Sequence, residues 1–153
     1  MANPLQFHRG LKAGLPTLAS GEPGFATDSF EFYIGTGSVN KPIGRHKVAS
    51  IASSATPTPA VDDSESTQYN LTALAENAIF GAPTTNGTLY DGQKLLIRIK
   101  DNGTAWTLGF NAIYRAIGVA LPTTTTISKT QYLGAFYNSA DTKWDVIAKG
   151  EEV

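Results

Sequence analysis

The chain has 153 residues, with 12 Lys and Arg against 13 Asp and Glu, so its formal net charge at pH 7 is -1. This length accommodates one ordinary domain or two small ones and excludes a long multidomain architecture. The near-neutral charge, the absence of long apolar runs and the lack of cysteine argue against nucleic-acid binding, membrane insertion, disulfides and Cys-ligated metals.

The first predicted strand is the run FEFYI at residues 30–34, where aromatic and β-branched residues stand between turn residues on both sides. Period-two alternation places its aromatic side chains on opposite faces, so some of them face solvent or a neighbour. Residues 5–44 contain many apolar side chains but too few residues to enclose them all. We therefore predict an N-terminal module over residues 1–55 that is marginal alone and docks onto something else.

A stretch of Pro, Thr and acidic residues follows at residues 56–66 (TPTPAVDDSES), with little to bury. We interpret it as a linker. Its cluster Asp62-Asp63-Ser64-Glu65 lacks the spacing of a calcium loop, so a solvated linker is the simpler interpretation.

Residues 67–153 are predicted to form a C-terminal antiparallel β-sandwich or jelly-roll-like domain, and the chain as a whole to be all-β. Two hairpins are expected. The first joins residues 93–100 to 104–108 through Asp101-Asn102-Gly103, with Leu95, Ile97 and Ile99 on one face and Arg98 and Lys100 on the other. The second joins residues 131–137 to 143–148.

The sequence offers little chemistry for catalysis. His8 and His46 are far apart and have no carboxylate in metal-ligand spacing, and no hydrolase, metallopeptidase or nucleotide-binding motif is present. We predict no catalytic residue, no metal ligand and no cofactor. A pair of carboxylates that cleaves glycans is the enzymatic alternative, because such groups meet only in space.

Aromatic residues in the C-terminal part have core packing as their default role. Trp106 and Trp144 are nevertheless candidate glycan contacts, provided that their rings are exposed beside polar groups.

Three N-terminal segments, LQFHRG (5–10), GEPGFATD (21–28) and YIGTG (33–37), together resemble the N-terminal attachment segment of tailed-bacteriophage fibre and tropism-determinant proteins. Residues 81–148 are similar to a C-terminal module of phage virion proteins, which implies a compact trimeric β domain. The resemblance implies a non-enzymatic virion component, and the lack of a long shaft favours a short spike or a capsid decoration protein.

We therefore expect a homotrimer on the exterior of the capsid or tail. It would be a head fibre or cement protein, or a short spike, whose N-terminal module is anchored to the major capsid protein or to a tail or baseplate protein. The low charged fraction, 16% against roughly 25% in average domains, also favours an oligomer. The alternative is a tail-fibre-type receptor-binding protein that recognises a host surface carbohydrate. The candidate attachment residues are Phe7, Arg9, Glu22, Phe25, Phe30, Phe32 and Tyr33; Arg9 and Glu22 either contact the docking surface or pair with each other.

Overall fold

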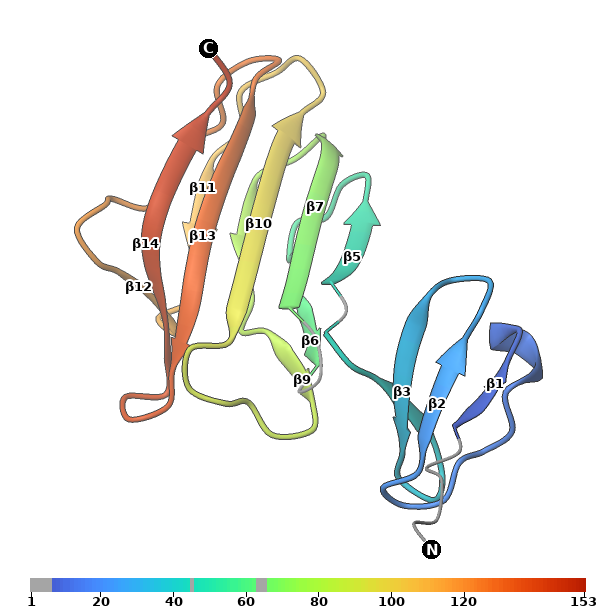
Figure 1. The fold of residues 1–153 in the computed structure, drawn as a ribbon. Helices are drawn as coiled ribbons and strands as arrows, with labels where there is room; N and C mark the ends of the chain where they lie inside the picture. The colour runs from blue at the N-terminus through green and yellow to red at the C-terminus, as the bar shows by residue number, and fades with distance from the viewer. Residues whose placement is uncertain (1–6, 45, 63–65) are drawn as a thin grey trace, which may run out of the picture. The chain divides into compact units, whose positions relative to one another are not determined.

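A computed structural model describes residues 7–44, 46–62 and 66–153 (Figure 1). The chain forms two compact units that divide between residues 45 and 46. We call them the N-terminal unit and the C-terminal unit. Both are built from β-strands, which confirms the all-β prediction.

The N-terminal unit is a four-stranded sheet in the order β1-β2-β3-β4. Strand β1 (His8–Gly10) lies parallel to β2 (Pro23–Ala26), and β2, β3 (Glu31–Gly35) and β4 (Asn40–Pro42) are antiparallel neighbours. A short 3-10 helix, η1 (Lys12–Gly14), follows β1. The predicted strand at residues 30–34 is thus confirmed as β3, shifted by one residue.

One face of this sheet packs on a very small core formed by Leu18, Ala26 and Tyr33, with Leu15 half-buried beside it. Gly35 lies so close to this core that an added Cβ atom would stand 2.2 Å from the carbonyl oxygen of Ala19. The glycine therefore lets the chain segment carrying Leu18 lie directly on β3.

The C-terminal unit centres on a six-stranded sheet in the order β12-β14-β13-β10-β7-β5. Three further pairs of segments extend the unit: β8 with β11, β6 with β9, and an isolated bridge between Thr107 and Thr124. The strands are β5 (His46–Ile51), β6 (Ala60–Asp62), β7 (Ser66–Leu74), β8 (Ala78–Phe80), β9 (Thr84–Asn86), β10 (Lys94–Asp101), β11 (Leu108–Phe110), β12 (Tyr114–Ala116), β13 (Thr130–Asn138) and β14 (Lys143–Glu151).

The core of the C-terminal unit lies on one face of this sheet. Strand β10 alternates strictly, with Leu95, Ile97 and Ile99 buried. These side chains belong to the same buried cluster as Phe80 of β8 and Leu108 of β11, and Figure 1 shows β11 behind the large sheet. The opposite face, which we call the open face, carries the outward residues of the same strands.

The expected antiparallel sandwich is wrong in its strand directions, because the six-stranded sheet is mixed. Strands β13 and β14 are antiparallel, as are β10 and β13, but β7 lies parallel to both β10 and β5. The connection between β7 and β10 contains the short strands β8 and β9 and returns the chain to the end from which β7 started. A long crossover of this kind produces a parallel neighbour, which a tight turn cannot do.

The two predicted hairpins had opposite outcomes. The hairpin of β13 and β14 is confirmed, with Asn138 paired to Lys143 across the expected turn. The hairpin after β10 is wrong, because β10 pairs with β13 and β7 instead. Asp101 Oδ1 accepts backbone hydrogen bonds from Gly103 and from the distant Ser128, both at 2.9 Å. These contacts tie the turn to the loop before β13, and the chain leaves the sheet.

The predicted module boundaries, 1–55, 56–66 and 67–153, also need correction. Residues 46–55 were assigned to the N-terminal module, yet β5 is the edge strand of the C-terminal sheet. The predicted linker is not a free connection in its described part, since β6 pairs with β9 and Val61 is buried in the main core. Pro57 and Pro59 are buried as well. Proline and threonine were misinterpreted here, because they are covered rather than solvated; residues 63–65 of the acidic cluster lie outside the described residues.

Asp101 gives the C-terminal unit a pH-dependent stability. Burial would raise the pKa of this carboxyl group, but the hydrogen bonds from the backbone N–H groups of Ser128 and Gly103 outweigh it and lower the pKa overall. A lowered folded-state pKa means that the carboxylate stabilises the fold above its ordinary value of about 3.9 and loses this contribution as the pH falls further.

We expect Asp101→Asn to lower the free energy of unfolding by about 1–2 kcal/mol near pH 7. The difference from the parent should shrink toward about pH 3, where the parent carboxylate takes up a proton. Urea unfolding of both proteins at the two pH values measures this. An equal difference at both values would contradict the role assigned to the charge.

Candidate docking surface

Five of the seven predicted attachment residues gather on the solvent-facing side of the N-terminal sheet. The residues are Phe7, Arg9, Phe25, Phe30 and Phe32, and we call this surface the aromatic face. The sheet register explains the gathering, because Arg9 of β1 lies beside Phe25 of β2, which lies directly opposite Phe32 of β3. Lateral neighbours in a sheet project to the same side.

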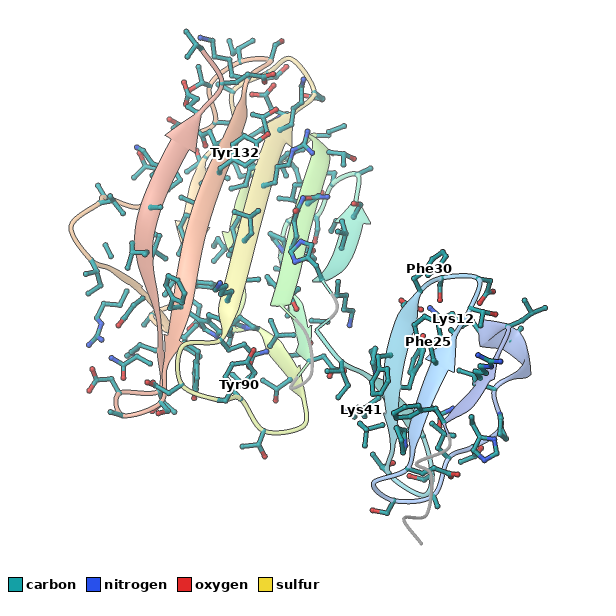
Figure 2. The ribbon with its side chains drawn as sticks, viewed as in Figure 1. Lys12, Phe25, Phe30, Lys41, Tyr90 and Tyr132 are labelled. Atoms are coloured by element: carbon teal, nitrogen blue, oxygen red, sulfur yellow. The ribbon has the colours of Figure 1, made fainter. Side chains whose placement is uncertain are left out.

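The four phenylalanine rings form two edge-to-face pairs. The rings of Phe7 and Phe32 are 5.6 Å apart between centroids, and those of Phe25 and Phe30 are 6.4 Å apart. Figure 2 shows Phe25 and Phe30 on this sheet. Phe7 remains 45% exposed and Phe32 36% exposed, so the rings contact one another without being enclosed. An apolar cluster left open in this way is typical of an interaction site.

Phe30 is the most unusual member of the aromatic face. It is 81% exposed, and its backbone has a φ of 55°, in the left-handed region that bulky residues rarely occupy. The residue therefore carries both a backbone strain and a solvation cost in the isolated chain. Neither cost stabilises the N-terminal unit, and both become understandable if Phe30 buries its ring against a partner.

Glu22 and Tyr33 contribute to folding rather than to the aromatic face. Glu22 pairs with His8 Nε2 at 2.9 Å instead of with Arg9, and its other oxygen accepts the backbone N–H of Ala19. Tyr33 is buried, and its hydroxyl donates to Glu31 at 2.6 Å. Burial, reinforced by this carboxylate, raises the pKa of Tyr33.

Sequence reasoning missed two residues at the margin of the aromatic face. Lys41 of β4 lies beside Ile34 of β3, on the same side as Phe32. Ile43 donates its backbone N–H to Phe32 and is 56% exposed. The signal was the alternation of β3 itself, but the register of β4 was needed to use it.

The candidate glycan contacts behave as core residues. Trp144 is completely buried and packs against Tyr137 with ring centroids 5.3 Å apart, so its assignment as a glycan contact is wrong. Trp106 is half-buried against the main core, and its indole N–H donates to Asn102 Oδ1 at 3.1 Å. Neither ring offers an exposed stacking platform.

The two histidines belong to different units. His8 pairs with Glu22, and His46 lies 3.3 Å from Gln68 Oε1. Within the described residues, no three histidine or acidic side chains converge as a metal site would require. In that same part of the chain, no helix has the length and hydrophobicity to cross a membrane.

Comparison with known protein families identifies the N-terminal segment. Residues 5–39 match the family described as Major tropism determinant N-terminal domain. The chain therefore begins with a segment like that of phage tropism determinants, as the three motifs predicted, and this indicates a phage virion component. No curated protein matches the chain. The matched region includes every residue of the aromatic face.

Proposed function

We propose, from the premise that residues 5–39 are tropism-determinant-like, that this protein is a non-enzymatic structural protein of a phage virion. It docks to the particle through the aromatic face of its N-terminal unit. The observation that carries the proposal is the contiguous, exposed cluster of four phenylalanines on a unit whose own core contains only Leu18, Ala26 and Tyr33 among fully buried apolar residues described.

The energetics favour docking by this surface. Burying a phenylalanine side chain contributes about 1.5–3 kcal/mol, so two or three such rings supply several kcal/mol per subunit. Arg9 and Lys41 stand at the edge of the cluster, where a cation adds selectivity for a partner with acidic groups. The particle protein that receives the aromatic face is a major capsid protein or a tail or baseplate protein.

Homotrimeric assembly is part of the proposal, as a capsid decoration protein or a short spike on the exterior of the particle. The low charged fraction of the chain supports an assembly that covers part of its surface. Three copies on one particle would also multiply a modest attachment energy by avidity. Multi-angle light scattering at micromolar concentration should give a trimer mass; a stable monomer would contradict this part of the proposal.

Phe30→Asn provides the sharpest test of docking. Asparagine tolerates positive φ better than phenylalanine, so we expect the N-terminal unit to keep or gain stability while binding to particles lacking the protein weakens at least about tenfold. Co-sedimentation with such particles measures binding, and thermal unfolding monitors the fold.

Ile79→Asn is the matched control for this test. Ile79 is 63% exposed but lies on β8 of the C-terminal unit, so its replacement removes a similar exposed apolar side chain outside the proposed docking surface. Binding should stay at the parental level. Equal losses from the two variants, or no loss from Phe30→Asn, would contradict docking by the aromatic face.

The alternative function, a tail-fibre-type receptor-binding protein for a host surface carbohydrate, no longer has Trp144 in its support. A different surface of the C-terminal unit favours a related role, and its geometry is given next.

A further inference from the structure

The open face of the six-stranded sheet holds an ordered array of side chains that the docking proposal does not use. The strand registers place Phe136 beside Lys94, Gly134 beside Leu96, and Tyr132 beside Arg98. Because each pair projects away from the core, aromatic and cationic side chains alternate along two neighbouring strands. Figure 2 shows Tyr132 on this sheet.

A groove of about 470 Å³ is sunk into this array. Its lining includes His46, Lys94, Leu96, Gly134, Phe136 and Ala148. Gly134 makes the hollow, since it contributes no side chain between Phe136 and Tyr132. These two rings are four residues apart on one face of β13, which corresponds to about 13 Å along a strand. The volume lies in the range of small-ligand sites, about 300–1,000 Å³.

The rim of the groove is cationic. Lys94 is exposed, and no residue that the structure describes forms an ion pair with its ammonium group. His46 lines the same groove from β5. Further along the face, the Arg98 guanidinium lies 5.7 Å from the centre of the Tyr132 ring. A ligand lying on the apolar floor would thus meet positive charge at its edge.

We infer that this groove binds an acidic saccharide, with one face of a sugar ring against Phe136 and Leu96 and its carboxylate paired with Lys94. A sugar ring presents an apolar C–H face to an aromatic ring and hydroxyl groups to its rim, which suits a small apolar floor with polar edges. The unpartnered cation selects an acidic sugar over a neutral one.

The charge pattern disfavours the other occupants of such a face. A second copy docked through the same surface by two-fold symmetry would place Lys94 and Arg98 against their own equivalents or each other. Nucleic acid needs a broader basic surface than a chain of net charge -1 supplies. This inference is independent of particle docking, because the groove belongs to the C-terminal unit and is tested on the free full-length protein.

The test is a titration with oligogalacturonate, compared with the uncharged oligogalactose, followed by calorimetry and by amide NMR. A wider array of acidic and neutral glycans accompanies it. We expect saturable binding of acidic glycans, a preference of about tenfold or more over neutral counterparts, and resonance shifts centred on Gly134 and Phe136.

Gly134→Val fills the groove without disturbing the core. A Cβ atom at this position would meet only Ala148 Cβ, at 3.5 Å, which is ordinary contact, and valine favours strands. We expect unchanged thermal stability and at least a tenfold loss of acidic-glycan binding. Gly134→Ala, which adds one methyl group, is the steric control and should retain most binding.

Lys94→Gln tests the charge, with the exposed Lys149→Gln outside the groove as its control. Lys94→Gln should remove the preference for acidic over neutral glycans, whereas Lys149→Gln should keep it. The inference is overturned if no acidic glycan binds, if acidic and neutral glycans bind equally well, or if Gly134→Val binds like the parent. Shifts of the groove resonances on dilution of the protein alone would overturn it in favour of self-association.

Discussion

Gly35→Ala is expected to unfold the N-terminal unit while the C-terminal unit remains folded. The new Cβ atom would stand 2.2 Å from the Ala19 carbonyl oxygen and 2.5 Å from Leu18 Cβ and the Leu18 carbonyl oxygen. Two of these three atoms belong to the backbone, so the chain over β3 must move. Overpacking of this kind costs about 3 kcal/mol or more, which a unit with so small a core has little stability to offset.

The measurement is an amide NMR spectrum together with thermal unfolding of the full chain. Resonances of residues 7–44 should collapse to unfolded positions, and those of the C-terminal unit should remain. Gly10→Ala is the control, because no atom outside its chain neighbours lies within 4 Å of a Cβ built there. If Gly35→Ala gives the same spectrum as Gly10→Ala, the close packing of Leu18 on β3 is wrong.

Trp144→Ala is expected to have the largest effect on the C-terminal unit, with a loss of about 3–5 kcal/mol in the free energy of unfolding. The indole is fully buried in the same core as Leu133 and Val146 and contacts Tyr137. Removing it leaves a cavity that the surrounding sheet cannot close. Denaturant unfolding followed by circular dichroism measures the loss.

Trp106→Ala provides the comparison within the same unit. Its ring is half-buried and makes one side-chain hydrogen bond, to Asn102, so the loss should be clearly smaller than that of Trp144→Ala. Equal losses, or a Trp144→Ala protein as stable as the parent, would contradict the position of Trp144 in the core.

The sequence predicted the features of the fold that depend on local pattern. The alternation of Leu95, Ile97 and Ile99 predicted which side of β10 faces the core, and the four-residue turn before Lys143 predicted the β13–β14 hairpin; both are confirmed. The parallel neighbours of β7 depend on long connections whose path no local pattern encodes. The turn at Asp101 failed as a hairpin signal for the same reason, because its carboxylate is held by the distant Ser128.

Prediction of the candidate site depended on the same distinction. Phe30 and Phe32 share a side by the period of a strand, and the glycine-rich motifs indicated a docking segment. The pairing of Phe25 opposite Phe32, and of Phe7 with Phe32, needed the register of three strands. Trp144 was misassigned because an aromatic residue in a strand has the same sequence signature on either face.

The central claim, that the aromatic face attaches this protein to a phage particle, is tested most directly by an electron cryo-microscopy reconstruction of particles carrying the full chain. We predict density for the N-terminal unit against a particle protein, with Phe30 and Phe32 at the contact and the C-terminal unit projecting outward. A reconstruction in which the C-terminal unit contacts the particle and the aromatic face lies open to solvent would contradict the account.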